Sequence, residues 1–353
     1  MERRKTKSVK VGKFLIGGDA PVTVQSMLNT KNGDVEAAVT QSQALKKVGC
    51  DIIRLAVTDE KSLEVVKELK KAIDLPLVAD IQFDFRMALG AIDAGIDKIR
   101  LNPGNIGSAD KVKSVVAAAA ERKIPIRVGV NSGSVSKEIA AKYGRYSAEG
   151  LVLEAMRHIL ILEDCNFEDI VISLKASNVA TMIESYRLMA SKCSYPLHLG
   201  VTEAGTSYSG TIKSAVGIGT LLAEGIGDTI RVSLTDQPEE EIRAGIEILK
   251  SLGLKKSGAT LVSCPTCSRC SVNLIQIAKE VEKRLANMPF PIKVAVMGCV
   301  VNGPGEAQDA DIGITGANGE GLIFKKGKII KKVPEDRIVD ELFVEIEKLF
   351  KER

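Results

Sequence analysis

Four of the seven cysteines in this 353-residue chain lie close together in its C-terminal part, at Cys264, Cys267, Cys270 and Cys299. In a large protein of a reducing compartment, such C-x-x-C spacing is typical of metal-binding or redox-active sites. An iron-sulfur cluster is the first interpretation, since a C-x-x-C turn with a distant third thiol is a common way to hold one. Zinc, with Cys270 as a fourth thiolate, is the alternative. Spacing alone leaves open which thiols bind.

Basic side chains recur in the middle of apolar runs. Ile53-Arg54-Leu55, Ile99-Arg100-Leu101, Ile126-Arg127-Val128 and Ile230-Arg231-Val232 share this pattern, and Lys175 ends a further apolar run. A charge in a buried parallel strand is costly unless it is paired, so packing does not explain these residues. Arginine donates two parallel hydrogen bonds to phosphate oxygens, so we expect the basic groups to converge on an anionic substrate. The alternative is a set of internal salt bridges, whose candidate acids are fewer: Asp80, Asp84 and Glu203.

Polar residues follow the same runs. They are Asp80, Asn102, Asn131, the Thr202-Glu203-Ala204-Gly205 segment and Ser233, and His198 lies within a run. We expect these residues to share one cavity with the basic groups, because active sites of parallel barrels lie at the strand C-termini. Of the two histidines, His198 is the functional candidate. His158 falls in a helical pattern, where we expect a solvated or structural role.

The elements that must position these residues repeat one theme over the first 250 residues, a short β-branched run followed by an amphipathic helical segment. Eight strands are predicted, at Val22–Met27, Asp51–Ala56, Pro76–Ile81, Asp97–Asn102, Pro125–Val130, Asp169–Leu174, Pro196–Val201 and Asp228–Leu234. This count and length predict a (β/α)8 TIM-type barrel. An open doubly wound sheet is the alternative, but no G-x-G-x-x-G follows the first strand. Residues 7–22, with Gly17 and Gly18, predict a hairpin that closes the barrel bottom.

After Leu254 the pattern changes to short strands and two helices, roughly Ser271–Ala286 and Glu335–Lys351. We therefore expect a barrel domain at residues 1–254 and a small α+β domain at residues 259–353. The link between them is short, which restricts their relative geometry. Such a link makes it difficult for the small domain to cover the mouth of its own barrel.

Composition excludes several classes of protein. The 49 basic and 45 acidic residues nearly balance, at a net charge of +4, so a dedicated nucleic-acid or membrane-surface binder is not expected. No run approaches the roughly 18 apolar residues of a membrane span, and the N-terminus lacks an apolar signal core. We expect a cytoplasmic enzyme.

Several strings resemble the 4-hydroxy-3-methylbut-2-enyl diphosphate synthase family of the non-mevalonate isoprenoid pathway. They run in order along nearly the whole chain: Val24–Met27, Asn102–Gly107, Gly129–Asn131, His198–Gly205, Cys264–Arg269 and Met297–Ala307. The two C-terminal strings are the most specific. The string Ala79–Phe83 departs from the family, which usually has histidine where this chain has Gln82, so a proton-transfer role there is not expected.

The resemblance implies a reductive enzyme with a [4Fe-4S] cluster held by Cys264, Cys267, Cys299 and Glu306, which leaves Cys270 aside. The implied reaction is two-electron reduction of 2-C-methyl-D-erythritol 2,4-cyclodiphosphate with ring opening and loss of water, with Glu203 as proton donor and His198 assisting. The residues expected to bind the cyclic diphosphate are Arg54, Asp80, Arg100, Asn102, Arg127, Asn131, Lys175, Arg231 and Ser233. Ferredoxin or flavodoxin is the implied electron donor. The family also implies a homodimer in which the cluster domain of one subunit caps the barrel of its partner.

Overall fold

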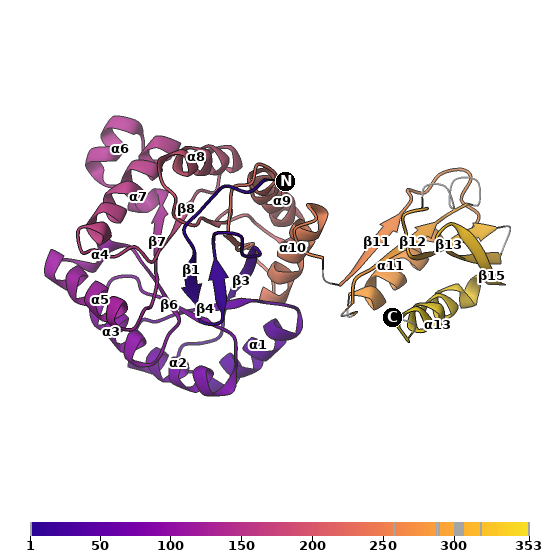
Figure 1. Ribbon diagram of the computed structural model, residues 1–353, viewed down its shortest axis with the longest axis horizontal. Coiled ribbons are helices and arrows are strands. Elements are labelled where there is room, and N and C mark those ends of the chain that lie inside the picture. Colours follow the sequence, from indigo (N-terminus) through magenta and orange to yellow (C-terminus); the bar gives the residue numbers. More distant parts are fainter. Residues whose placement is uncertain are drawn as a thin grey trace. The chain divides into compact units, whose positions relative to one another are not determined.

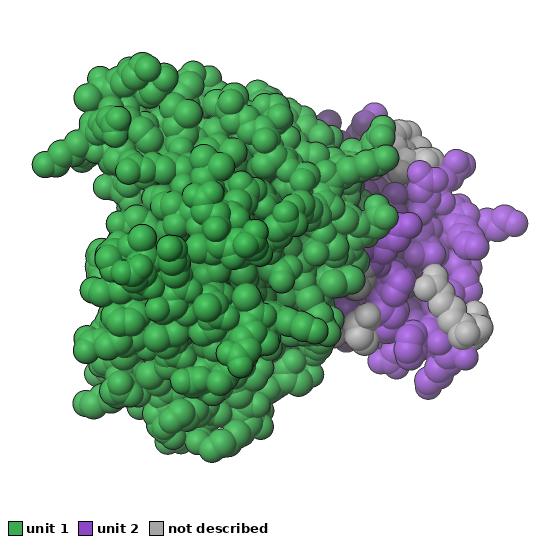
Figure 2. Space-filling view, turned by 60° about the vertical axis from the view of Figure 1, so that its left-hand side comes forward, with its two compact units in different colours: residues 1–255 green, residues 256–353 purple. Residues whose placement is uncertain are grey.

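The computed structural model describes residues 2–256, 258–286, 288, 290–299, 307–317 and 320–351. They form two compact units, residues 1–255 and residues 256–353, which are coloured separately in Figure 2. Each unit buries an apolar core of its own. Among the described residues, no helix has the length and apolar character needed to cross a membrane.

The first unit is built on eight parallel strands in the order β8-β7-β6-β5-β4-β3-β10-β9. A bridge between Ile172 and Leu197 joins the two outer strands and closes the sheet, so the predicted (β/α)8 barrel is confirmed. The expected strands at 196–201 and 228–234 are real but short, with two paired residues each. The eight strands are β3 Thr23–Met27, β4 Ile52–Ala56, β5 Leu77–Asp80, β6 Lys98–Leu101, β7 Ile126–Asn131, β8 Ile170–Lys175, β9 His198–Leu199 and β10 Thr229–Ile230.

Helices form a ring around these strands (Figure 1). They are α1 Val35–Lys47, α2 Glu60–Ala72, α3 Phe85–Asp93, α4 Pro103–Ile106, α5 Ala109–Glu121, α6 Lys137–Tyr143, α7 Ala148–Glu163, α8 Val179–Lys192, α9 Ser207–Ala223 and α10 Pro238–Ser251. Helix α2 illustrates why they form. Asp59 and Ser62 make a reciprocal capping box at its start, and Leu63, Val66 and Leu69 bury one face.

A hairpin precedes the barrel, as predicted, but its turn lies elsewhere. Strands β1 Val9–Val11 and β2 Phe14–Ile16 are antiparallel and are joined by a two-residue turn at Gly12 and Lys13. Gly12 has a φ of +55°, which glycine adopts without the steric cost that other residues have. Gly17 and Gly18, where the sequence indicated the turn, form the bend after the hairpin.

The hairpin packs against the barrel end at which the strands begin. Val11 and Ile16 form an apolar cluster with Ile52 and Val78, near the starts of β4 and β5. Arg4 holds the segment before the hairpin, since its guanidinium donates to the carbonyl oxygen of Cys193 at 2.6 Å. The hairpin therefore covers the bottom of the barrel beneath β4 and β5.

The second unit has a five-stranded sheet in the order β11-β12-β13-β14-β15. Strands β11 Ala259–Ser263, β12 Ile292–Met297 and β13 Ile312–Ala317 are parallel to one another, and β14 Glu320–Lys325 and β15 Lys328–Pro334 continue antiparallel. Helices α11 Leu274–Leu285 and α13 Ile338–Lys351 bury Val281 and Leu342 in this unit's core.

Candidate active site

A pocket opens at the mouth of the barrel. It is lined by Arg54, Arg127, Ser173, Lys175, Tyr186, His198, Gly200, Val201, Thr202, Arg231 and Ser233. Seven of the residues predicted from the sequence meet here, from strands β4, β7, β8 and β9 and from the segments after β9 and β10. A second pocket at the mouth is lined by Gln82, Phe83, Arg100, Asn102, Asn105, Asn131 and Ser134. Arg100 and Arg127 are register partners on adjacent strands, so the two pockets share one cationic wall.

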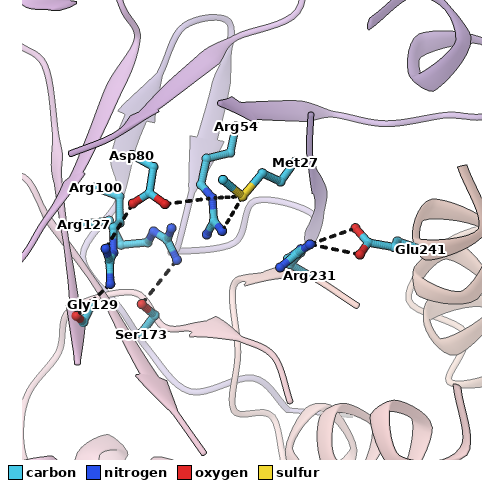
Figure 3. Close-up of polar contacts among 9 residues, drawn as sticks. All are labelled: Met27, Arg54, Asp80, Arg100, Arg127, Gly129, Ser173, Arg231 and Glu241. Atoms are coloured by element: carbon cyan, nitrogen blue, oxygen red, sulfur yellow. Dashed lines mark hydrogen bonds and ion pairs between the residues drawn. The ribbon is translucent and has the colours of Figure 1, made fainter. Parts of the chain in front are cut away.

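Asp80 is the carboxylate at the centre of the cationic residues (Figure 3). Its Oδ1 accepts from Arg100 Nη1 at 3.1 Å, and its Oδ2 lies 3.9 Å from Arg54 Nε. Burial alone would raise the pKa of Asp80, but Arg54, Arg100 and Arg127 outweigh it and lower that pKa. Asp80 is therefore ionised and compensates part of the local positive charge, so the internal salt bridges considered above form in part.

Arg100 and Arg127 keep unused donors. Arg127 is fully buried and donates from Nη1 to Ser173 Oγ at 3.2 Å, while its Nε and Nη2 have no partner in the described structure. Arg100 donates to the carbonyl oxygen of Gly129 at 3.3 Å. A Cβ at Gly129 would lie 2.7 Å from Arg100 Nε, so glycine is needed for Arg100 to lie there. Buried unpaired donors are costly, and an anion in the pocket would satisfy them.

Arg54 and Arg231 border the same pocket. Arg54 donates from Nη2 to the Met27 thioether at 2.7 Å, which is a weak acceptor, and burial lowers its pKa to about 10. Arg231 turns towards Glu241 on helix α10, at 2.9 Å (Figure 3). Glu241 also accepts from Ser26 Oγ at 2.9 Å, so it fixes the position of Arg231.

Lys175 ends strand β8 in this pocket. Burial, followed by repulsion from Arg54, Arg100 and Arg127, lowers its pKa to about 6. Near neutral pH the amine is therefore mostly uncharged in the empty pocket. A bound anion would favour its protonated form.

His198 lies inside the barrel and is 4% exposed. Burial first, and then the charge of Arg127, lower its pKa, so the imidazole is neutral. His158, by contrast, lies on helix α7 with Nε2 3.1 Å from Glu154 Oε1. It is buried away from solvent, so the structural role is right and the solvated one is wrong.

Glu203 is exposed beside Thr202, a residue of the pocket lining. Its φ is +53°, in the left-handed region that costs a non-glycine residue about 1 to 3 kcal/mol. Such strain persists where the surrounding structure holds it, often at functional sites. Asn102 is buried and caps helix α4 through Gly104 N–H, whereas Asn131 is exposed in the second pocket.

In the second unit, the cysteines lie where β11 and β12 end. Cys264 Sγ accepts from the backbone N–H of Gly298 at 3.2 Å, which places it beside the segment leading to Cys299. Cys267 is exposed, and hydrogen bonding from the backbone N–H of Arg269 lowers its pKa towards thiolate formation. Cys270 instead donates to the carbonyl oxygen of Val272 at 3.2 Å.

The thiols at Cys264, Cys267 and Cys299 fit the chemistry of an iron-sulfur cluster, because they are soft donors on neighbouring loops at one sheet edge. In the described part of the chain, no three ligand side chains are close enough to hold a single metal ion. Glu306, the expected fourth ligand, lies outside the described residues.

Comparison with known proteins identifies the family. Residues 6–246 match the model of the GcpE TIM-barrel domain, and residues 260–348 match that of the GcpE protein C-terminal domain. The chain belongs to the GcpE family. A relative from Clostridium perfringens is 60% identical over 98% of this chain and 99% of its own, and one from Clostridium acetobutylicum is 59% identical over 99% and 100%. Both relatives are named 4-hydroxy-3-methylbut-2-en-1-yl diphosphate synthase (flavodoxin). The resemblance found in the sequence is confirmed.

Solved structures are similar in the barrel part. Dihydropteroate synthase from Stenotrophomonas maltophilia aligns with a TM-score of 0.52 at 16% identity, over 70% of this chain and 97% of its own. The enzyme from Xanthomonas albilineans aligns with a TM-score of 0.50 at 13% identity, with the same coverage. At these identities, the likeness shows a shared barrel fold and nothing about the GcpE chain's substrate.

The residues of this GcpE site that the sequence did not indicate include Lys98, Ser173, Tyr186 and Glu241. Lys98 was detectable, because it is two residues before Arg100 in the same strand and must share its face. Tyr186, on helix α8, donates to the backbone carbonyl of His198. Nothing in the sequence distinguishes Glu241 from the other acidic residues in the first turn of α10.

Proposed function

We propose that this chain catalyses the reductive ring opening and dehydroxylation of 2-C-methyl-D-erythritol 2,4-cyclodiphosphate to 4-hydroxy-3-methylbut-2-enyl diphosphate. The observation that carries the proposal is the buried cationic pocket of a barrel whose full chain is about 60% identical to synthases of that name. We propose that it acts in the cytoplasm, where thiols stay reduced. In the proposed division, residues 1–254 bind the substrate and residues 259–353 bind the redox cofactor.

The pocket residues would hold the diphosphate. Among the described residues, Arg127 and Arg100 have buried N–H groups without partners, and the hydrogen bonds that Arg54 donates go to a thioether. Phosphate oxygens would satisfy these donors, with Lys175 on β8 beside Arg127, Arg231 and Ser233 after β10, and Asn102 and Asn131 at the second pocket. As the ring opens, negative charge grows on the leaving phosphate oxygen, and donors already in place stabilise it. Asp80 would keep Arg54 and Arg100 oriented towards that oxygen.

Loss of water requires a proton on the departing hydroxyl oxygen. Glu203 is the proposed donor, because it is an exposed carboxylic acid next to Thr202, which lines the pocket. His198 is neutral and buried, so its proposed part is to orient the substrate by a hydrogen bond. Gln82 lines the second pocket where the family usually has histidine, and it can hydrogen-bond without titrating.

Cys264, Cys267, Cys299 and Glu306 would hold a [4Fe-4S] cluster. When bound, this group supplies single electrons and a Lewis-acidic iron. The weaker Glu306 carboxylate ligand would leave that iron open to exchange. The names of the relatives include flavodoxin, so a one-electron donor of the flavodoxin or ferredoxin type is the proposed partner.

A homodimer with shared active sites is part of the proposal. The link between the two parts is short, so a cluster domain reaches the partner's barrel more readily than its own. Mixing Cys264→Ser protomers with Glu203→Gln protomers should restore activity, because each mixed dimer then contains one site with both groups intact. Mixed dimers that form but stay inactive would exclude the shared arrangement.

The test of the function is iron and sulfide analysis of anaerobically isolated protein, with EPR of the dithionite-reduced form before and after adding the cyclodiphosphate. We expect a [4Fe-4S] signal that changes with substrate. Stoichiometric zinc without acid-labile sulfide would refute the reductase and favour a barrel transferase with a structural zinc domain.

A further inference from the structure

Lys98 is a fully buried lysine inside the barrel, and it has no part in the function proposed above. Its side chain is 0% exposed, and its Nζ has no hydrogen-bond partner in the described residues. Because strand residues alternate between faces, Lys98 faces the same way as Arg100, one layer deeper. Its register partner Val78 packs against the N-terminal hairpin. Lys98 therefore lies between the bottom of the barrel and the arginines of the pocket.

The titratable groups that act on Lys98 in the described structure are basic side chains. Arg127 on β7 and Arg54 on β4 repel a proton on Lys98 and so lower its pKa, and His198 on β9 is close enough to interact with it electrostatically. No carboxylate among the described residues compensates it. Asp80, two residues beyond Val78, is engaged by Arg100 and Arg54.

The remaining nearby acids are also engaged elsewhere. Asp97 accepts from the backbone N–H of Leu77 and from Lys70, and Glu241 binds Arg231. An isolated ammonium group in such a place is very costly, so the amine is neutral in the empty barrel. Burial and Arg127 together move its pKa well below the ordinary lysine value.

Neutral polar groups are available to solvate a charge on Lys98. Thr23, Gln25 and Thr229 share their strand faces with Met27 and Arg231, so they point into the barrel. Each has a buried oxygen that finds no hydrogen-bond partner among the described residues. Methionine would fill the same space without a polar group to bury. In the part of the chain that the structure describes, the carboxylates near Lys98 are engaged by other residues, and a diphosphate at Arg127 and Arg54 would bring the negative charge that a protonated lysine needs.

We propose that Lys98 is the inner cation of the anion site: it is neutral in the empty barrel and takes up a proton when a diphosphate binds to the arginines above it. This rests on the proposed function only in naming the cyclic diphosphate. Each phosphate of that ligand has one ester and one anhydride bond, which leaves a single strongly acidic oxygen and no proton that titrates near neutral pH, so proton uptake on binding comes from the protein. Lys175 is a second acceptor, which gives an uptake approaching two protons.

The experiment is calorimetric binding of the cyclodiphosphate to the oxidised full-length protein, which cannot turn over, in buffers of different ionisation enthalpy. Lys98→Met, Lys175→Met and the surface control Lys113→Met are compared with wild type. Inorganic pyrophosphate is the second probe, and its proton uptake on binding is compared between wild type and the three variants. Each proton taken up makes the affinity fall about tenfold per pH unit as pH rises.

We expect Lys98→Met to take up about one proton fewer on binding the anion than wild type and Lys113→Met do. The slope of its logarithmic affinity against pH should be smaller by about one. Lys175→Met should retain about one proton of uptake, which tests Lys98 without altering it. Equal uptake in wild type and Lys98→Met, or none in Lys175→Met, would overturn the proposal. If both anions bind with this uptake but reduced enzyme forms no product, the function fails and the assignment of Lys98 stands. Failure of both anions to bind would overturn both.

Discussion

Replacing Asp80 with asparagine tests whether one carboxylate compensates the cationic mouth. Its oxygens lie 3.1 Å from Arg100 Nη1 and 3.9 Å from Arg54 Nε, and all three side chains are at most 10% exposed. At an effective dielectric constant of about 20, these separations correspond to gross attractions of about 5 and about 4 kcal/mol. Desolvation offsets much of this, and removing one partner of a buried pair costs about 3 to 5 kcal/mol.

We predict that Asp80→Asn lowers the free energy of unfolding by about 3 kcal/mol, the lower end of that range, because the amide oxygen still accepts a hydrogen bond. For a barrel of this size, that corresponds to a melting temperature lower by about 6 to 12 °C. Calorimetry or far-UV circular dichroism measures it. Inorganic pyrophosphate should raise the melting temperature of Asp80→Asn more than that of wild type, since the anion replaces the missing negative charge.

The pH dependence gives an independent check. The pKa of Asp80 is lowered in the folded protein, so its stabilisation is present above the unfolded value of about 4 and is lost as pH falls through the folded pKa. The difference in the free energy of unfolding between Asp80→Asn and wild type should therefore become smaller as the pH falls. Asp84→Asn is the matched control, because Asp84 pairs with exposed Arg86 and asparagine retains its helix cap. An Asp80→Asn protein that melts with wild type at neutral pH, and responds equally to pyrophosphate, would refute the reasoning.

Three further predictions concern single residues. Glu241→Gln should cost about 2 kcal/mol of unfolding free energy in urea titration, because Arg231 loses its carboxylate; a change below about 0.5 kcal/mol would contradict this. Lys175, with its pKa of about 6, should react with cyanate at neutral pH faster than exposed Lys113, and pyrophosphate should protect it; equal rates would count against a neutral amine. Cys264→Ser should lose iron and sulfide while Cys270→Ser keeps both, and the reverse pattern would show that the ligands are misassigned.

The barrel was predictable because its signals are local and repeated. Eight β-branched runs, each followed by a helical pattern, indicate parallel strands, and the basic residues within them had to face the interior. The hairpin was also predictable, but the position of its turn was not. Gly12 and Gly17 both have positive φ, and only the pairing of Val11 with Phe14 decides which glycine turns the chain.

The partners of the basic residues could not be predicted, because they depend on contacts distant in the sequence. Glu241 reaches Arg231 and Ser26 across the barrel wall, and sequence separation hides this contact. The depth of each side chain also requires the closed sheet. Lys98 and Arg100 are both basic residues of the same apolar run, yet Arg100 pairs with Asp80 and Lys98 has no described partner.

The hairpin covers one end of the barrel, and the pocket opens at the other end. Val11 and Ile16 cover the side away from the pocket, and Arg54 and Arg127, which line the pocket, lie on the side of Lys98 from which a ligand enters. A ligand bound to the arginines would therefore hold in place a proton or water molecule taken up at Lys98. That proton or water molecule would leave only after the ligand has dissociated. A short N-terminal deletion that removed the hairpin would give the interior a second entrance, and with it would end this order.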